Sequence, residues 1–153
     1  MADEAYRAVF LRVHPTGKIV LSLTTDSDGQ EPAHAALVAK ELGVPALDVK
    51  VIAADTARFG DGHGFNTSPS AGISAAISSA SEKIRAKARL LAGAALDASP
   101  ETLAWSNWAW IAGNGGDPGQ VKTIEAIALY AHGTGALPSG VEGGLDAQTV
   151  YRD

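Results

Sequence analysis

The chain has 153 residues, of which 46% are hydrophobic and 19% are charged, and its formal net charge at pH 7 is −5. This composition is typical of a globular domain and excludes a disordered or low-complexity chain. The acidic balance, without any lysine- or arginine-rich block, argues against nucleic acid as the main partner.

Two absences narrow the class of protein further. The chain contains no cysteine, which excludes disulfides, thiolate metal sites and iron–sulfur clusters within it. The first ten residues, MADEAYRAVF, carry acids where a signal peptide needs basic residues, and charged residues or serines interrupt the longer apolar stretches. We therefore expect a cytoplasmic protein without a membrane segment, folded as a single domain over residues 1–153.

The N-terminal part predicts a β-hairpin. Apolar residues alternate well enough for a strand from Ala5 to Val13, the turn His14–Lys18 contains proline and glycine, and Ile19–Leu23 forms the returning strand.

A polar turn and an amphipathic helix follow the hairpin. The turn is Asp26–Gly29, and Pro32 occupies a first-turn position, where its fixed φ and missing N–H cost nothing. Glu31 places a negative charge at the positive end of the helix dipole. Apolar residues continue at helical spacing as far as Leu42, and Gly43 is the expected C-terminal cap.

A buried strand, a glycine-rich loop and a long helix come next. Val49–Ile52 forms the strand, and Asp55–Ser70 forms the loop. One helix is predicted over Ala71–Ala98, because a single apolar seam runs along it at spacings of three or four residues. The seam consists of Ile73, Ile77, Ala80, Ile84, Ala88, Leu91 and Ala95. We expect this helix to be packed centrally.

The C-terminal third mixes short strands with one more helix. Thr102–Trp105 and Asn107–Ile111 predict a small hairpin, and Val121–Ala131 predicts a short helix capped by Thr123. Ala147–Tyr151 forms a last strand. The combination indicates an α+β fold, in which hairpins and a mixed sheet pack with two main helices.

Histidine and tryptophan residues give weaker signals. The four histidines, at positions 14, 34, 63 and 132, have no helical metal-ligand spacing, so no metal site is predicted. The spacing of Trp105, Trp108 and Trp110 predicts at least one ring in the core. Whether the others belong to the core or to a partner-facing patch stays open.

The strongest candidate for a ligand site lies at two helix starts. Gly29 allows the backbone to approach a ligand, and the following helix directs free N–H groups and a positive dipole end at it. The segment Thr67–Ser70 precedes the long helix in the same way and adds hydroxyl groups. If the two starts converge, they form a seat for a phosphate or a pterin. The alternative is that these residues are ordinary turns and helix caps.

A family resemblance rests on the stretch GQEPAHAALVAKELGVPALDVKVIAADT. Glu41–Pro45, Asp48–Val51 and Asp55–Thr56 fit the Glu-Leu-Gly-Val-Pro, Asp-Val-x-Val and Asp-Thr segments of xanthine dehydrogenase-family molybdenum hydroxylases. The chain therefore resembles the second molybdopterin-binding region of their large subunit, from about Ala8 to Tyr151. The resemblance implies a molybdopterin-binding-domain-like fold.

The resemblance also implies the site residues. An ungapped alignment places the family's Gly-Gln-Gly turn on Ser27–Gly29, with Asp28 at the glutamine position. Gln30 takes that position only if the helix is shortened, so Gly29 and Gln30 are the candidates in this turn. The family's Gly-Ser-Arg-Ser loop corresponds to residues 67–70, so Thr67, Ser68 and Ser70 are further candidates for holding the cofactor. Within that loop a proline replaces the arginine. No glutamate here matches the family's catalytic Gly-Glu-x-Gly segment, so no catalytic residue is predicted in this chain.

The implied function is that of a small subunit or domain of a molybdenum hydroxylase, which oxidises an aldehyde or an N-heterocycle with water as the oxygen source. The chain would help to hold molybdopterin, in its dinucleotide form, together with larger subunits of a hetero-oligomer. Iron–sulfur clusters and FAD would lie only on those other subunits. The alternative is a non-catalytic structural or assembly subunit of the same scaffold without cofactor contact. An independent small-ligand binding protein is a third possibility, for which no positive motif is present.

Overall fold

The computed structural model describes residues 7–60, 71–106, 108–113, 117–133 and 137–152, and these contain two β-sheets and four α-helices. The four-stranded sheet has the order β3-β2-β1-β7, formed by Val49–Ile52, Ile19–Leu23, Ala8–Val13 and Asp146–Val150. The three-stranded sheet has the order β4-β5-β6, formed by Ala104–Ser106, Ala109–Ile111 and Val121–Thr123. The helices are α1 (Glu31–Leu42), α2 (Thr56–Phe59), α3 (Ile73–Ala95) and α4 (Ile124–Ala131), and the short 3₁₀ turns are η1 (Ala46–Asp48), η2 (Pro100–Thr102) and η3 (Pro118–Gln120). The predicted α+β class is confirmed.

The four-stranded sheet is mixed because its connections differ. β1 and β2 form the predicted hairpin, in which Val13 pairs with Ile19 and Gly17 takes a φ of 86° in the turn. β2 and β3 are parallel, since α1 crosses between them and returns the chain to the same edge. One face of the sheet is buried against the helices, through side chains at alternate positions: Val9, Leu11, Val13, Ile19, Leu21 and Leu23.

Helix α1 has the predicted bounds, and Gly43 is confirmed as its C-terminal cap. Gly43 adopts a φ of 71°, and its N–H donates to the carbonyl of Ala39 at 2.8 Å. Trp108 packs directly over this cap. A Cβ added to Gly43 would lie 1.8 Å from the Cβ of Trp108, so only glycine fits there.

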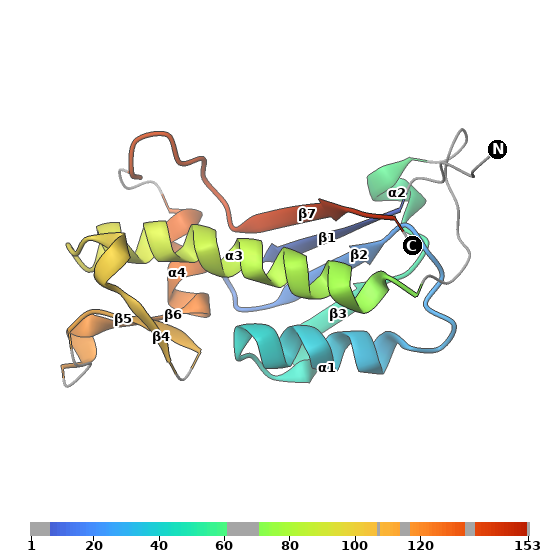
Figure 1. Ribbon diagram of the computed structural model, residues 1–153, viewed down its shortest axis with the longest axis horizontal. Coiled ribbons are helices and arrows are strands. Elements are labelled where there is room, and N and C mark those ends of the chain that lie inside the picture. Colours follow the sequence, from blue (N-terminus) through green and yellow to red (C-terminus); the bar gives the residue numbers. More distant parts are fainter. Residues whose placement is uncertain (1–6, 61–70, 107, 114–116, 134–136, 153) are drawn as a thin grey trace.

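Helix α3 runs along the molecule, in front of the four-stranded sheet and above the three-stranded sheet in the view of Figure 1. It packs against α1, α4, β1 and β7, and the predicted apolar seam lies in the core from Ile77 to Leu91. The helix spans Ile73–Ala95 rather than Ala71–Ala98. It ends early because Ala98 turns back and donates its N–H to the carbonyl of Gly93 at 2.8 Å.

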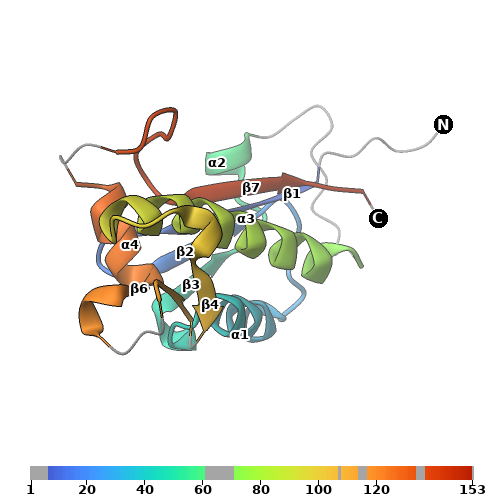
Figure 2. The same cartoon turned by 60° about the vertical axis from the view of Figure 1, so that its left-hand side comes forward.

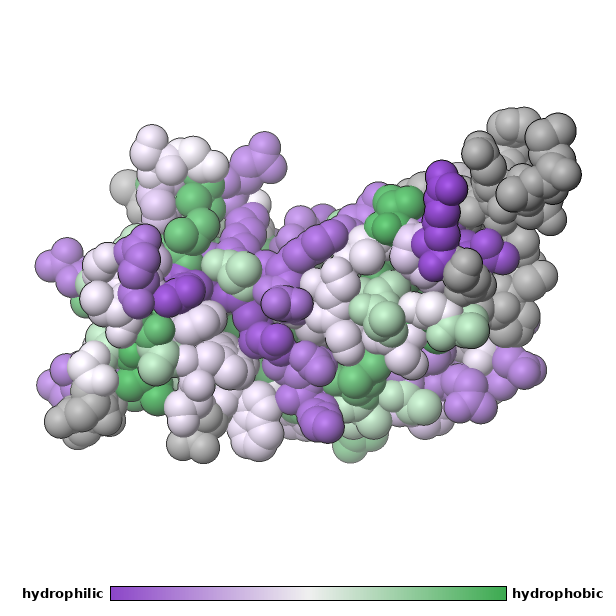
Figure 3. Space-filling model, in the orientation of Figure 1, coloured by the Kyte–Doolittle hydropathy of each residue, from purple (hydrophilic) through white to green (hydrophobic). Residues whose placement is uncertain are grey.

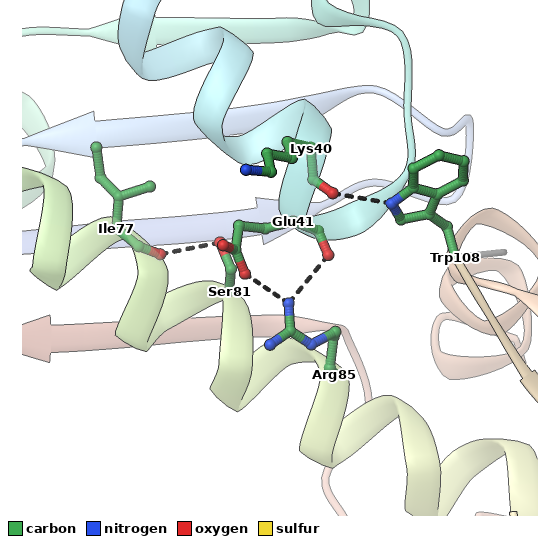
Figure 4. Close-up of polar contacts among 6 residues, drawn as sticks. All are labelled: Lys40, Glu41, Ile77, Ser81, Arg85 and Trp108. Atoms are coloured by element: carbon green, nitrogen blue, oxygen red, sulfur yellow. Dashed lines mark hydrogen bonds and ion pairs between the residues drawn. The ribbon is translucent and has the colours of Figure 1, made fainter. Parts of the chain in front are cut away.

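Polar contacts tie α1 to α3 (Figure 4). The guanidinium of Arg85 donates to the carboxylate of Glu41 at 2.6 Å and to the Glu41 carbonyl at 3.0 Å. The buried hydroxyl of Ser81 is satisfied within α3, since it donates to the carbonyl of Ile77 at 2.9 Å. On the other side of α1, the Trp108 indole N–H donates to the carbonyl of Lys40 at 2.9 Å.

Two segments differ from the predicted elements. The predicted loop Asp55–Ser70 begins with α2, because Asp55 caps a helical turn by accepting from the N–H of Arg58 at 3.2 Å. The predicted helix Val121–Ala131 is split: Val121–Thr123 pairs with β5 as a strand, and α4 begins only after Thr123. The predicted cap is confirmed, since the Thr123 hydroxyl accepts from the N–H of Ala126 at 3.2 Å.

The tryptophans divide between core and surface. Trp110 is buried and donates its indole N–H to the carbonyl of Arg85 at 3.0 Å, so the expectation of one core ring is confirmed. Trp105 is half-buried beside it, with ring centroids 5.4 Å apart. Trp108 is 50% exposed.

Hydrophobic side chains form only small, separated patches on the face of the molecule seen in Figure 3. Among the described residues, no helix combines the length and the apolar content that crossing a bilayer requires.

Candidate functional site

The two predicted helix starts lie at one end of the molecule. Helices α1 and α3 pack side by side, run in the same direction and begin at the same end (Figures 1 and 2). The parallel strands β2 and β3 also end there. The positive ends of two helix dipoles therefore point the same way, which is the condition that the candidate ligand site requires.

The turn before α1, called here the Gly29 turn (Asp26–Gln30), has an open backbone. Asp28 and Gly29 adopt φ values of 50° and 77°. The turn is closed by the N–H of Gln30, which donates to the carbonyl of Ser27 at 2.9 Å, and by the N–H of Asp28, which donates to the Asp26 carboxylate at 3.2 Å. A Cβ added at Gly29 would meet no atom within 4 Å, so the space beside it is open.

Unused backbone donors remain at this turn. Neither Gly29 nor Ala33 donates its N–H to any group in the described part of the chain. Such N–H groups at a helix start bind anions readily. The N–H of Gln30 is already used, so Gln30 could contact a ligand only through its exposed side-chain amide.

The side chains around the turn are acidic, whereas the backbone N–H groups of the turn favour an anion. Asp26, Asp28 and Glu31 gather within six residues, and Asp26 and Asp28 are exposed. The nearby Ser27 hydroxyl and then the backbone N–H of Glu31 itself lower the pKa of the Glu31 carboxyl, so Glu31 is ionised at neutral pH. The backbone thus favours an anion, whereas these carboxylates oppose one.

A layer of buried polar residues lies beneath the turn. Thr24, Thr25, Ser27, His34 and Asp55 are each at most 9% exposed. Thr24 bridges to the backbone of Ala8, and Asp55 caps α2. Burial lowers the pKa of His34 despite the neighbouring Glu31, so the ring is neutral at pH 7. In the described residues, no group of three or more His, Asp or Glu side chains could hold a metal ion.

The predicted site residues are thus only partly placed. Gly29 and Gln30 lie at the open turn before α1, at the same end of the molecule as the beginning of α3. Thr67, Ser68 and Ser70 lie outside the described residues. The buried residues Ser27, His34 and Asp55 were not predicted. The sequence signals were a run of polar residues, Thr24–Ser27, directly after a buried strand, and the Asp-Thr segment of the family resemblance at Asp55.

Sequence comparison matches the chain to one part of much longer proteins. Residues 2–153 match the family model described as the molybdopterin cofactor-binding domain. The carbon monoxide dehydrogenase large chain of Afipia carboxidovorans is 34% identical over 146 residues, which are 92% of this chain and 17% of that one. The corresponding chain of Hydrogenophaga pseudoflava is 36% identical over the same shares. The chain therefore spans about a sixth of the length of these relatives.

Solved structures give the same result for the fold. A Cu,Mo-CO dehydrogenase in its carbon monoxide reduced state matches with a TM-score of 0.80 and 29% identity, over 95% of this chain and 18% of that one. Quinoline 2-oxidoreductase from Pseudomonas putida 86 matches with a TM-score of 0.73 and 27% identity, over 95% of this chain and 19% of that one.

Proposed function

The chain belongs to the molybdopterin cofactor-binding domain family, in the form found in the large chains of molybdenum hydroxylases such as CO dehydrogenase and quinoline oxidoreductase, and on that premise we propose that it holds part of a molybdopterin cofactor. The single observation that carries this proposal is the open Gly29 turn at the start of α1, where the N–H groups of Gly29 and Ala33 have no acceptor among the described residues and share one end of the molecule with the start of α3.

The chain's own residues fit such a group through their backbone. The N–H groups of Gly29 and Ala33 would donate to anionic oxygens of the cofactor, and the Gln30 amide would add a neutral donor. The hydroxyls of Thr67, Ser68 and Ser70 would complete the contact, as the family resemblance implies. These residues bind and orient, and none of them moves a proton or a hydride.

The bound group would supply the redox chemistry by which an aldehyde or an N-heterocycle is hydroxylated with water. The chain spans only about a sixth of its relatives' length. We therefore propose that other polypeptide segments supply the catalytic base, the rest of the cofactor site and the iron–sulfur and flavin centres. In this proposal the chain is a single domain of a larger, cytoplasmic hetero-oligomer.

A second candidate function is favoured by the charge of the Gly29 turn. Asp28 faces solvent beside Asp26 and the ionised Glu31, and like charges disfavour an anionic cofactor there. The alternative is a structural subunit, in which the same scaffold serves assembly without touching the cofactor.

The two candidates are separated by cofactor retention in the complex purified from the protein's own source. We would measure molybdenum and pterin per chain for Gly29→Ala, Ser68→Ala and Asp28→Asn. Cofactor contact predicts that the first two variants lose cofactor and that Asp28→Asn retains it more tightly. Glu142→Gln, an exposed carboxylate in the loop after α4, serves as the control for charge alone. Unchanged retention in both Gly29→Ala and Ser68→Ala would leave the structural role as the better account.

A further inference from the structure

An open groove runs along the exposed side of α3, far from its start. One hollow of about 500 Å³ lies between α3 and the η2 turn and reaches Trp110. A second hollow of about 420 Å³ continues past the C-terminal end of α3 to Pro138. Because Leu90 and Pro100 line both, the two hollows form one surface, called here the α3 groove.

The floor of the α3 groove is apolar. Along α3 the apolar lining residues Ala86, Leu90 and Ala94 recur at helical spacing and form one stripe, which Glu82 begins and Asp97, just after the helix, follows. Leu90, at its centre, is 45% exposed. Pro100 and Pro138 form the opposite wall. Covering this floor would remove apolar surface from water.

The two arginines of the groove are engaged within the chain. The charge of Arg85 is compensated by Glu41, whose carboxylate lies 2.6 Å away. Arg89 donates to the carbonyl of Pro100 at 2.7 Å and to that of Glu101 at 3.2 Å. Its guanidinium also lies 5.2 Å from the centre of the Trp110 ring.

The remaining charge on the rim is negative. The carboxylates of Glu82, Asp97 and Glu101 face one uncompensated arginine, Arg89. The hydroxyl of Ser99 is the main cause that lowers the pKa of Glu101, so this carboxyl is ionised at neutral pH. The negative end of the α3 dipole points to the same region, and no basic residue lies in its last turn.

We infer that the α3 groove is a docking surface for a basic amphipathic helix of a partner polypeptide. The helical stripe from Glu82 to Ala94 covers about 18 Å of helix axis at 1.5 Å per residue, which matches a partner helix of about three turns. Apolar side chains of that helix cover Leu90 and the proline wall, and its lysines or arginines meet the three carboxylates.

A second copy of this chain is a poorer occupant. Two copies packed groove to groove would bring Glu82, Asp97 and Glu101 toward their own counterparts, and like charges in an interface oppose association. This inference is independent of cofactor binding, because the groove lies at the opposite end of α3 from the Gly29 turn (Figure 1).

The test uses the full 153-residue chain, labelled for NMR, and a synthetic helical peptide with leucines at i, i+3/i+4 and i+7 spacing and flanking lysines. We expect signals of residues 82–101 and of the Trp110 indole to shift, and those of the Gly29 turn to stay in place. The same peptide with glutamates in place of lysines should not bind. The inference is overturned if the basic peptide shifts no signals at millimolar concentration, or shifts them elsewhere.

Matched variants separate the groove from general charge attraction. The triple variant Glu82→Gln, Asp97→Asn, Glu101→Gln should bind the peptide about tenfold more weakly, since each exposed ion pair contributes a factor of a few. The triple variant Asp26→Asn, Asp28→Asn, Glu142→Gln changes the net charge equally outside the groove and should bind as before. Leu90→Gln tests the apolar floor with every carboxylate intact and should weaken binding several-fold. Equal weakening by both triple variants would overturn the inference, and so would a dimer in sedimentation that the groove variants dissociate.

Discussion

Two glycines with similar backbone angles have different roles. Gly43 and Gly29 have φ values of 71° and 77°, a region that costs other residues roughly 1–2 kcal/mol. At Gly29 the space for a side chain is open, whereas at Gly43 a Cβ would overlap Trp108. Backbone conformation alone constrains Gly29, whereas backbone conformation and side-chain packing together constrain Gly43.

We therefore predict that Gly43→Ala destabilises the protein more than Gly29→Ala. Gly29→Ala should cost about 1 kcal/mol through backbone strain alone. Gly43→Ala should cost about 3 kcal/mol, because the Trp108 side chain must also shift to avoid the new methyl group. Urea unfolding of both variants measures the difference. In the Trp108→Gly background, which removes the Trp108 Cβ as well as the ring, the extra cost of Gly43→Ala should disappear, and its persistence would contradict the packing argument.

At the scale of residues, local signals could be predicted and tertiary ones could not. The cap at Gly43 and the turn at Gly29 follow from their immediate neighbours in sequence. The contact with Trp108 comes from a residue 65 positions later, and nothing in the pattern indicates it. The burial of Ser27, His34 and Asp55 likewise depends on how β3, α1 and α2 meet.

Among the elements, α3 shows how a strong periodic pattern predicts a helix but not its end. The seam from Ile73 to Ala95 identified the helix and its central packing. The end was misplaced because it depends on one backbone hydrogen bond, from Ala98 to Gly93. Similarly, Val121–Thr123 has helix-compatible neighbours, yet pairing with β5 makes it a strand. Three residues are too few for periodicity to distinguish the two.

Gly93, within the last turn of α3, allows a prediction that opposes helix propensity. Replacing a mid-helix glycine by alanine normally stabilises by about 1 kcal/mol. Here an added Cβ would lie 2.9 Å from both the Ala98 carbonyl oxygen and the Pro100 Cγ. We expect Gly93→Ala to destabilise by roughly 1–2 kcal/mol, because this overlap outweighs propensity.

The neighbouring position is the control for Gly93→Ala. Ala94 is exposed in the same turn, so Ala94→Gly should cost about 1 kcal/mol through propensity alone. Thermal or urea unfolding of the two variants measures both changes in stability. A more stable Gly93→Ala variant would show that the turn after α3 relaxes freely.

The two sheets share one core because α3 passes from one to the other. It packs on α1, β1 and β7 around the large sheet and on α4, η2 and β5 around the small one. The buried seam is continuous across both regions, through Ile77, Ile84 and Leu91. This continuity indicates that neither sheet is a separate folding unit, although the sequence, read locally, showed only two hairpin-bearing regions.

We predict that the 153-residue chain unfolds in one cooperative transition. All three tryptophans, at positions 105, 108 and 110, lie in or beside the small sheet, so their fluorescence reports on that sheet. Far-UV circular dichroism reports mainly on α1 and α3, which cover the large sheet. If the core is shared, the two signals change at the same urea concentration.

A substitution that creates a cavity in the apolar seam of α3 makes this test of cooperativity more sensitive. Ile84 is fully buried at the middle of α3, so Ile84→Ala should destabilise by about 2–5 kcal/mol. With one core, the fluorescence and dichroism midpoints move down together by the same amount. If the small sheet were an independent unit, its fluorescence transition would separate from the dichroism transition. Because Trp110 donates to the carbonyl of Arg85, one residue beyond Ile84, we expect the transitions to stay together.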